Sequence, residues 1–285
     1  MVEGYSPNNL QEALKILNEK DMIIYAGGTD LMVKNKNSTS LLPGFTKDLL
    51  YVGNLKELKE IKSDDNKIEI GAVCTLSFLL RIESVPEVLK KAIRSIASPA
   101  IRNMGTIGGN ICNASPAGDT LPILYALDAK LKLVSLSSSR EVKIDDFILG
   151  PGKTILKNNE ILESVLIEKI NFNKVFYEKV GARKACAISK VSFTALAKIN
   201  NEKIEDIRIA VGSVGPKIVR EKSVEEILIG KEIKEIGNFL PEVEKIYSQK
   251  ITPINDQRST ATYRKTVVLR LIQYFLNIEL NHISN

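Results

Sequence analysis

Two glycine pairs give this sequence its clearest pattern for ligand binding. One pair lies in "YAGGTDL" (25–31) and the other in "TIGGN" (106–110), and short hydrogen-bonding residues flank both. Glycine has no Cβ and adopts positive φ at little cost, so the backbone N–H groups beside it can approach a ligand closely. A diphosphate offers several acceptor oxygens that such amides can hold without a lysine. Two facing loops of this kind predict a diphosphate site, while the alternative for either pair alone is a tight turn.

The longer stretch "TIGGNICNASPAGD" (106–119) contains no Lys, Arg or Glu, although the rest of the chain is rich in them. Charged side chains there would fill the space that a diphosphate needs. The stretch ends at Asp119, just before the apolar run "TLPILYALDA", where a carboxylate can cap a helix. We therefore expect a loop of small side chains that leads into a helix.

Other phosphate-binding motifs do not fit. No G-x-G-x-x-G follows an expected strand, so a Rossmann site is not predicted. "GPGKT" (150–154) imitates the end of a Walker A loop, but Phe147 stands where that motif has its first glycine, and Pro151 has no N–H to donate. We interpret this stretch as an ordinary turn.

The side chains that usually carry enzymatic chemistry are scarce. The sole histidine, His282, stands near the end of the sequence, which argues against Ser–His–Asp catalysis and a histidine zinc site. Cys74, Cys112 and Cys186 are too few and too far apart for a disulfide framework, a metal knuckle or a four-cysteine iron–sulfur cluster. We expect no catalytic side chain and no metal site, so a bound cofactor should supply the chemistry.

The composition is that of a folded protein with two domains. The chain of 285 residues exceeds the usual size of one hydrophobic core, and 44% hydrophobic and 26% charged residues are typical of a globular protein. The net charge of +6 is spread along the chain among Glu and Asp, which predicts a solvated surface and no nucleic-acid binding. The sequence shows no signal peptide and no apolar run of ~18 residues, so we expect a cytoplasmic protein that binds no membrane.

The first half of the sequence alternates helices with strands. Pro7 predicts the start of a helix over 7–19, and the apolar run "DMIIY" predicts a strand that ends at the first glycine pair. The alternation in "KIEIGAVCTL" (67–76) predicts another strand. A helix that opens at Pro86 should end near residue 98, where the loop with the second glycine pair begins.

Strands dominate the middle of the sequence and helices its end. Two strands joined by a serine turn are expected within 130–149, and a hairpin is expected over Asn200–Asn201. Helices are expected over 223–229, 233–247 and 259–279. The expected core stripe of the last helix is Val267, Leu271, Phe275 and Ile278. This order predicts an α+β fold with domains 1–172 and 173–285.

Five stretches share one resemblance. They are "YAGGTDLM" (25–32), "SPAIRNMGTIGGNICNASPAGDTLP" (98–122), "GPGKT" (150–154), "EIL" (160–162) and "QRSTATYRK" (257–265). Together they resemble the FAD-binding (medium) subunit of the molybdenum hydroxylases, the family of xanthine dehydrogenase and carbon monoxide dehydrogenase. The similarity runs from the first expected helix to the last, and the second stretch is its most specific part.

The resemblance implies a fold and a set of FAD-binding residues. The fold would be an FAD-binding domain of the vanillyl-alcohol-oxidase type, with two α+β subdomains, followed by a small C-terminal α+β domain with an antiparallel sheet. The glycine loops would wrap the FAD diphosphate and ribityl chain, Asp119 would lie in the flavin pocket, and Lys179 would lie near the isoalloxazine ring. The implied residues are Ile24, Tyr25, Ala26, Gly27, Gly28, Thr29, Asp30, Leu31, Ile96, Thr106, Ile107, Gly108, Gly109, Asn110, Asp119, Leu162 and Lys179.

The sequence also departs from some relatives in the resemblance. Some flavoproteins of this fold attach FAD through histidine; with only His282 available, the FAD should be noncovalent. Cys112 could form a thioether, but we favour a small buried thiol that lines the loop. The loop after Lys179, "VGARKACAISK", lacks the acidic pair of animal-type xanthine dehydrogenases, and no cluster-binding insertion of the 4-hydroxybenzoyl-CoA reductase kind is visible.

The resemblance implies an FAD-dependent oxidoreductase subunit within a heteromeric complex. A large partner subunit would hold molybdopterin and hydroxylate the substrate, a small partner subunit would hold [2Fe–2S] clusters, and electrons would leave through FAD to NAD+. Xanthine or another purine is the first expected substrate; nicotinate, carbon monoxide or an aldehyde is the alternative within the family. Outside this role, the same fold could serve as an independent flavin oxidase or as a binding or assembly protein without turnover.

Overall fold

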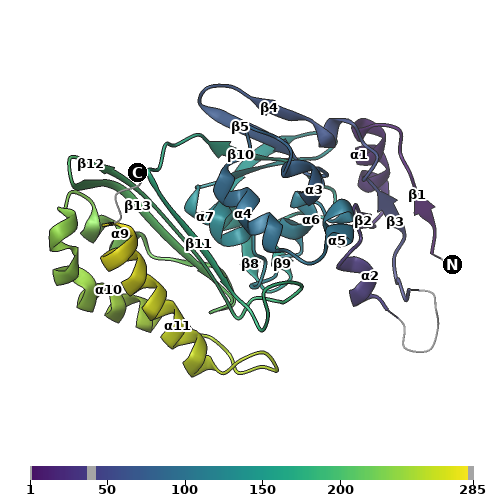
Figure 1. The fold of residues 1–285 in the computed structure, drawn as a ribbon. Coiled ribbons are helices and arrows are strands. Elements are labelled where there is room, and N and C mark those ends of the chain that lie inside the picture. Colours follow the sequence, from purple (N-terminus) through teal and green to yellow (C-terminus); the bar gives the residue numbers. More distant parts are fainter. Residues whose placement is uncertain (1, 37–42, 282–285) are drawn as a thin grey trace. The chain divides into compact units, whose positions relative to one another are not determined.

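The computed structural model describes residues 2–36 and 43–281. His282 lies outside the described residues. The chain divides into two compact units (Figure 1). Unit 1 comprises residues 1–85, 97–114 and 128–169, and unit 2 comprises residues 86–96, 115–127 and 170–285. Two segments from the first half of the sequence therefore belong to the same unit as the C-terminal part.

Unit 1 begins with a parallel three-stranded sheet. Its order is β1 (Gly4–Tyr5), β3 (Leu49–Tyr51) and β2 (Ile23–Tyr25). Helix α1 (Leu10–Glu19) buries Ala13, Leu14 and Leu17 in a core that includes Leu50 of β3. Burial of these aliphatic side chains holds β2 in place, and the first glycine pair follows directly after that strand.

Helix α1 begins later than the sequence predicts. Asn9 is its cap, and Asn9 Oδ1 accepts a hydrogen bond from the Glu12 amide at 2.9 Å. The predicted start at Pro7 is wrong because Asn9 competes with the Ser–Pro signal and satisfies an amide of the first turn.

The second sheet of unit 1 is antiparallel. Its order is β4 (Ile61–Ser63), β5 (Lys67–Gly71), β10 (Ile161–Glu168), β6 (Lys130–Val134) and β7 (Ser139–Lys143). The strand predicted after residue 67 and the pair joined by a serine turn are confirmed. The pairing of β10 with β6 shifts between Leu162 and Ser164, which marks a β-bulge.

Two short helices occupy the stretch that the sequence predicts as a loop. Ser98 caps α5 (Pro99–Met104) by accepting a hydrogen bond from the Ile101 amide at 3.4 Å. Thr106 caps α6 (Ile107–Cys112) by accepting one from the Gly109 amide at 3.0 Å. Each helix has six residues, too few for the apolar repeat by which longer helices are recognised.

The "GPGKT" stretch forms the turn of a small hairpin. It joins β8 (Ile148–Gly150) to β9 (Lys153–Thr154), and Gly152 in the turn has φ of +68°. Helix α8 (Ile144–Phe147) precedes the hairpin. The stretch does not lead into a helix as a Walker A loop does, so its interpretation as a turn is confirmed.

Unit 2 contains a four-stranded antiparallel sheet. Its order is β11 (Lys174–Val180), β12 (Val191–Asn200), β13 (Lys203–Gly212) and β14 (Val219–Arg220). Asn201 and Glu202 connect β12 to β13 with φ of +48° and +61°. Two positive φ values are typical of a type I′ hairpin turn, and the predicted hairpin is confirmed.

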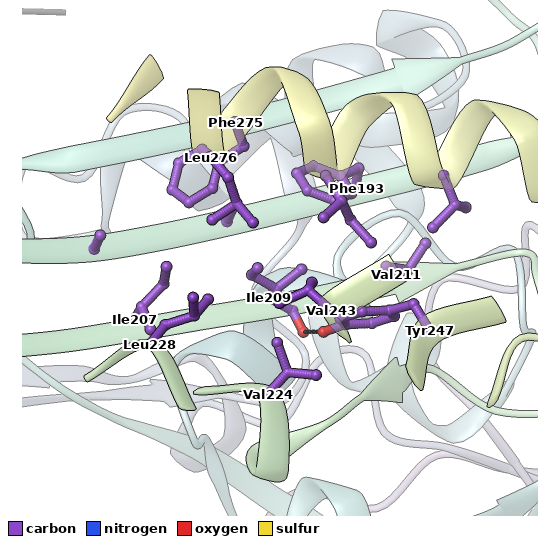
Figure 2. Close-up of a cluster of buried hydrophobic side chains, with 14 of the residues drawn as sticks. Phe193, Ile207, Ile209, Val211, Val224, Leu228, Val243, Tyr247, Phe275 and Leu276 are labelled. Atoms are coloured by element: carbon purple, nitrogen blue, oxygen red, sulfur yellow. Dashed lines mark hydrogen bonds between the residues drawn. The ribbon is translucent and has the colours of Figure 1, made fainter. Parts of the chain in front are cut away.

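Three helices follow this sheet in the sequence and cover one of its faces (Figure 1). They are α9 (Lys222–Leu228), α10 (Ile236–Lys250) and α11 (Ala261–Tyr274), and a π-helical turn (Phe275–Glu279) extends the last. Figure 2 shows the core between them, with Phe193 of β12, Ile209 of β13 and Tyr247 of α10. The Tyr247 hydroxyl donates to the Ile209 carbonyl at 3.0 Å, so the one polar atom of this ring is satisfied.

The most deeply buried stripe of helix α11 is displaced from the one predicted. Val268, Ile272 and Phe275 are fully buried, whereas Ile278 is 44% exposed. The buried stripe begins with Arg264, which is 2% exposed. Val267 and Leu271 are partly buried and pack against the same core, so three of the four predicted residues contact it and Ile278 is wrong. A charged residue at the head of a core stripe is invisible to a search for apolar periodicity.

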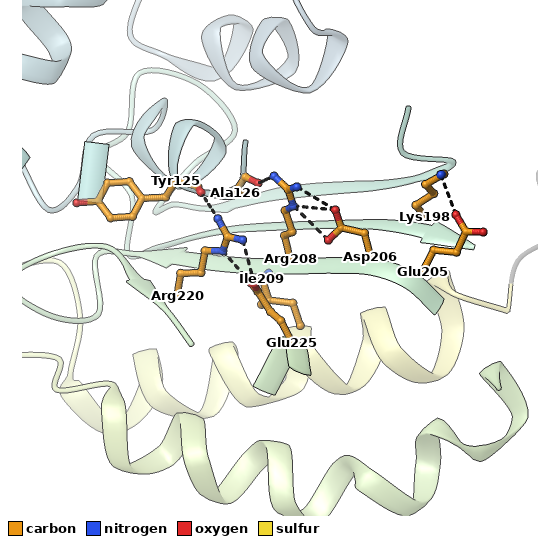
Figure 3. A network of polar contacts seen from close by, with 9 residues as sticks. All are labelled: Tyr125, Ala126, Lys198, Glu205, Asp206, Arg208, Ile209, Arg220 and Glu225. Carbon is orange, nitrogen blue, oxygen red and sulfur yellow. Dashed lines mark hydrogen bonds and ion pairs between the residues drawn. The ribbon is translucent and has the colours of Figure 1, made fainter. Parts of the chain in front are cut away.

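Two arginines of unit 2 hold the last turn of α7 (Leu121–Ala126). Arg208 donates to the Ala126 carbonyl at 3.1 Å, and Arg220 donates to the Tyr125 carbonyl at 2.5 Å (Figure 3). Arg220 also makes a two-point ion pair with Glu225, at 2.8 and 2.9 Å. Cations at a helix C-terminus are favourable, and these two anchor the helix that follows Asp119.

None of the helices within residues 2–36 and 43–281 is both long enough and apolar enough to pass through a membrane.

Candidate functional site

The two glycine loops of unit 1 touch each other through their backbones. A Cβ on Gly27 would lie 2.0 Å from the carbonyl oxygen of Met104. A Cβ on Gly105 would lie 3.4 Å from Thr29 Oγ1. Only glycine therefore fits at position 27 while the loops keep this separation. The first loop therefore lies against the two residues that precede the second loop, so the two loops are neighbours as the sequence predicts.

Gly28 is needed for its positive φ, as the sequence suggests, whereas Gly27 and Gly108 are needed for a different reason. Gly28 has φ of +69°, which other residues adopt at a cost. A Cβ on Gly108 would lie 2.6 Å from Ala72 Cβ. The sequence predicts that absent side chains leave room for a ligand. For Gly27 and Gly108 that reason is wrong, because the chain's own backbone and side chains occupy the space.

The amides of the second loop are already paired within the chain. The Ile107 amide donates to the Cys74 carbonyl at 3.1 Å, and the Gly108 amide donates to the Ala72 carbonyl at 2.8 Å. The Gly109 and Asn110 amides donate to the hydroxyl and the carbonyl of Thr106, each at 3.0 Å. Amides that are committed in this way are not available as donors to a diphosphate. The donor role of this loop's amides towards a diphosphate stays a prediction.

The first loop has the opposite property. None of the residues that the structure describes accepts a hydrogen bond from the four consecutive amides Gly27, Gly28, Thr29 and Asp30. The first three residues are half-buried and Asp30 is exposed. Consecutive unpaired N–H groups in a turn form an anion-binding concavity. This loop fits a diphosphate, and its donors are the main-chain groups that the sequence predicts there.

Asp119 in unit 2 does not cap a helix. The residue before α7 is Thr120, and the Asp119 carboxylate instead accepts hydrogen bonds from Lys179 Nζ at 2.7 Å and from the Ser189 hydroxyl. The side chains of Asp119 and Lys179 are only 8% and 11% exposed. Burial raises the pKa of the Asp119 carboxyl, against the opposite effects of Lys179 and Ser189. The predicted capping role is wrong because other groups occupy both oxygens.

Lys179 is held on a second side by helix α4 (Glu87–Ser95). Its Nζ donates to the carbonyl of Ser95 at 2.9 Å, and the Ser95 hydroxyl lies 3.3 Å from the Tyr177 hydroxyl. Burial raises the pKa of Tyr177, so its phenol is neutral at physiological pH. The sequence predicts Asp119 and Lys179 as separate site residues, and the structure joins them into one buried ion pair.

Three residues around this ion pair are not among the predicted site residues: Ser95 and Ser189, which contact it directly, and Tyr177, which contacts Ser95. Tyr177 stands two positions before Lys179 on β11, so strand alternation places both side chains on one face and could have indicated it. Ser95 and Ser189 carry no signal in the sequence, because their contacts join segments that are far apart in the chain.

The other predicted residues fall at varied places. Residues 24–31 and 106–110 and Leu162 lie in unit 1, and Ile96 lies in unit 2 with Asp119 and Lys179. Leu162 is 4% exposed beside the bulge of β10, and Ile96 is half-buried at the end of α4. Asp30 forms an exposed ion pair with Lys34 at 2.9 Å.

Cys74 and Cys112 have no features of reactive groups. Burial raises the pKa of the Cys112 thiol to about 12 and that of the Cys74 thiol to about 11. A protonated thiol is a poor nucleophile and a poor metal ligand. Across the described ranges, no three side chains of His, Cys, Asp or Glu come together as a metal site.

Comparison with known proteins decides which family has this arrangement. Residues 1–168 match the family described as the FAD binding domain in molybdopterin dehydrogenase. Residues 176–278 match the CO dehydrogenase flavoprotein C-terminal domain. The chain is an FAD-binding subunit of the molybdenum hydroxylase family. The predicted family and the predicted FAD are confirmed.

Relatives of this FAD-binding subunit are similar over most of their length. The glyceraldehyde dehydrogenase medium chain of Sulfolobus acidocaldarius is 33% identical over 91% of this chain and 92% of its own. The nicotinate dehydrogenase FAD-subunit of Eubacterium barkeri is 34% identical over 80% and 79%. A solved carbon monoxide dehydrogenase structure from Hydrogenophaga pseudoflava is 25% identical, with a TM-score of 0.88 over 98% of this chain and 96% of that chain.

These comparisons also confirm the fold and the class of activity. The FAD-binding subunit has the predicted α+β architecture, an FAD-binding domain of the vanillyl-alcohol-oxidase type followed by a C-terminal domain with an antiparallel sheet. It is an FAD-dependent oxidoreductase subunit.

Proposed function

We propose that this subunit is the electron exit of a molybdenum hydroxylase complex. In this proposal it accepts electrons from [2Fe–2S] clusters on a small partner subunit and delivers them to NAD+. Bound FAD supplies the two-electron redox chemistry, because the chemistry of a flavoenzyme belongs to its cofactor. The part of the chain is to hold the cofactor, exclude water from it and set the charge around it.

The observation that carries the proposal is the run of unpaired amides at residues 27–30. A diphosphate bound there would accept hydrogen bonds from main-chain dipoles that are already in place, so little reorganisation would accompany binding. Residues 106–110 would border the same site, because Gly27 lies against the backbone before them. Ile24 and Tyr25, at the end of β2, complete the proposed unit 1 contacts, together with Leu162.

The buried ion pair of unit 2 supports the placement of the flavin ring. A charge pair with exposures of 8% and 11% adds little net stability compared with apolar residues, which favours a functional reason for it. We propose that Asp119 and Lys179 face the isoalloxazine ring, with Ile96 as an apolar neighbour. The Ser95 and Ser189 contacts would then hold both charged groups in place beside the ring.

The partners, substrate and boundaries belong to the same proposal. A molybdopterin-binding large subunit and a [2Fe–2S] small subunit are supported by the name of the similar glyceraldehyde dehydrogenase medium chain, which implies larger and smaller chains beside it. Xanthine or another purine stays a prediction, since the two relatives above are named for glyceraldehyde and nicotinate. We propose residues 1–172 and 173–285 as the functional domains and the cytoplasm, where NAD+ is available, as the location.

Purification of the full chain tests the proposal. We expect a yellow protein that releases unmodified FAD on denaturation and whose bound flavin is bleached by NADH in a stopped-flow experiment. A flavoprotein that NADH does not reduce, but that an isolated [2Fe–2S] partner does, would overturn the choice of NAD+ and leave the electron-transfer role intact. A chain that takes up no FAD would overturn the proposal as a whole.

A further inference from the structure

The "QRSTATYRK" stretch places a buried arginine in the first turn of α11. Arg264 is 2% exposed, and its Nη1 donates to the carbonyls of Lys190 and Ser213 at 3.0 and 2.9 Å. Its Nη2 donates to Asp256 Oδ1 at 2.7 Å. Arginine is seldom buried so fully, and its planar guanidinium presents donors in fixed directions. One side chain therefore holds three separate segments of unit 2.

The first carbonyl belongs to the residue that closes the loop between β11 and β12. The Lys190 amide donates to the Val180 carbonyl at 2.8 Å, so the loop 181–189 is closed at its base. Ser189, fully buried, is the last residue of this loop and gives its hydroxyl to Asp119. The hold of Arg264 on Lys190 thus fixes the point from which Ser189 reaches the carboxylate.

The second carbonyl belongs to a strained residue. Ser213 has φ of +67°, a conformation that a non-glycine residue keeps only when its surroundings impose it. Its amide donates to the Pro116 carbonyl at 2.8 Å, and its own carbonyl accepts from Arg264. Pro116 lies three positions before Asp119. Arg264 therefore reaches the surroundings of Asp119 by two routes, through Ser189 and through Pro116.

We propose that Arg264 is a positioning residue for the flavin. It fixes the Ser189 hydroxyl and the loop that bears Asp119, so that the carboxylate stays paired with Lys179 in the orientation that the flavin ring requires. This inference rests on the proposed function, which places that ion pair beside the ring. Arg264 touches no cofactor itself and acts entirely through main-chain carbonyls.

Arg258 supplies a matched control. It donates to Asp256 Oδ2 through Nε at 2.9 Å and Nη2 at 2.5 Å, so both arginines share one carboxylate. The Arg258 side chain is 39% exposed, and none of its hydrogen bonds within the described residues reaches Lys190 or Ser213. R258Q removes one ion pair with Asp256 and keeps the contacts of Arg264 with the Lys190 and Ser213 carbonyls. R264Q removes the other ion pair with Asp256 and both of these carbonyl contacts.

The test measures the FAD dissociation constant and the flavin midpoint potential of the full chain. The variants are R264Q, R264K, R258Q, S189A and the double variant S189A/R264Q. We expect R264Q to raise the dissociation constant about tenfold and to shift the potential, R264K to recover part of both, and R258Q to stay within about twofold of the parent. S189A should change the dissociation constant and the potential in the same direction as R264Q does. In the double variant, S189A should raise the dissociation constant of R264Q by less than about twofold, because the two residues act on one carboxylate.

Several results would overturn the inference. R264Q with the parent's dissociation constant and potential would do so, as would R258Q with the same losses as R264Q, or S189A and R264Q effects that multiply. If R264Q does not fold, R264K and the R264K/S189A pair carry the same comparison. D119N and K179M separate this inference from the proposed function. If they leave the flavin unchanged, the placement of the ion pair fails; if they change it and R264Q does not, only the role of Arg264 fails.

Discussion

The Asp119 carboxylate and the Lys179 ammonium lie 2.7 Å apart, joined from positions 60 residues apart in the chain. Neither residue is exposed by more than 11% of its side chain. Lys179 Nζ also donates to the end of α4, and Asp119 also accepts from Ser189, so each charge has a second polar partner. A buried pair in which each charge has a second polar partner is held in one geometry, as its proposed place beside the flavin requires.

Removal of one member of this pair should destabilise the chain. K179M leaves Asp119 buried without its cation, and we expect a loss of about 2 to 4 kcal/mol in the free energy of unfolding. Urea unfolding of the FAD-free chain measures this loss. The variant K62M removes an exposed ion pair with Glu60 and should cost far less. Equal losses in the two variants would contradict the account.

The pH dependence of the same variant has a definite sign. The pKa of Asp119 is raised above 3.8 in the folded chain by burial, so the folded state binds this proton more tightly than the unfolded state. Stability from this group is therefore complete below pH 3.8 and decreases as pH rises to the folded pKa. Lys179 lowers the pKa of Asp119, so K179M should raise that pKa further. The decrease in stability with rising pH should therefore extend to higher pH in K179M than in the parent. Unfolding titrations across this range give the comparison.

The contact between the glycine loops predicts a severe substitution. In G27A the new Cβ would lie 2.0 Å from the Met104 carbonyl oxygen, which forces the loops apart. We expect a loss of about 3 kcal/mol in unfolding free energy, together with weaker FAD binding. G237A is the control, because nothing lies within 4 Å of its added Cβ, and helix propensity should raise its stability by about 0.5 to 1 kcal/mol. Thermal unfolding and flavin fluorescence report both effects.

Asp256 should make the C-terminal part of the fold sensitive to acid. Burial acts to raise its pKa, but hydrogen bonds from Arg258, Ser259 and Arg264 outweigh burial and hold that pKa below 3.8. The stability it contributes is present above pH 3.8 and is lost as pH falls towards the lower folded pKa. D256N should cost about 2 kcal/mol at neutral pH and remove this part of the acid sensitivity. A D256N chain with the parent's acid profile would refute the assignment.

Cys112 should be dispensable for cofactor attachment. Its thiol pKa of about 12 leaves it protonated at neutral pH, so a thioether to the flavin is not expected. C112S should retain FAD in the parent's stoichiometry, and acid denaturation of either protein should release all of the flavin as unmodified FAD. Flavin that stays with the denatured parent chain and not with C112S would show that the noncovalent assignment is wrong.

The sequence predicts local structure best where one signal dominates. The Asn200–Asn201 hairpin, the serine turn and the strand before Gly27 are all found, because turn residues and apolar runs strongly restrict the local conformation. The start of α1 is wrong and the most deeply buried stripe of α11 is displaced, because Asn9 and Arg264 make contacts that outweigh the generic patterns. Helices α5 and α6 are missed because they are too short to show a period.

The candidate site could likewise be predicted only in part from the sequence. The resemblance names Asp119 and Lys179, but their pairing and the roles of Ser95 and Ser189 depend on contacts that no local pattern encodes. The first glycine pair lies against the backbone just before the second loop, yet only the first loop keeps unpaired amides among the described residues. Whether a glycine leaves room for a ligand or for another part of the chain depends on tertiary packing, which spacing alone does not give.

Hydrogen exchange of the full chain with and without FAD tests the central claim most directly. The amides of residues 27–30 donate to none of the residues that the structure describes, so we expect them to exchange rapidly in the FAD-free chain and to become protected when FAD binds. The amides of residues 107–110 are paired within the chain and should be protected in both states. If FAD binds and leaves exchange at residues 27–30 unchanged, those amides do not hold the diphosphate and the account is contradicted.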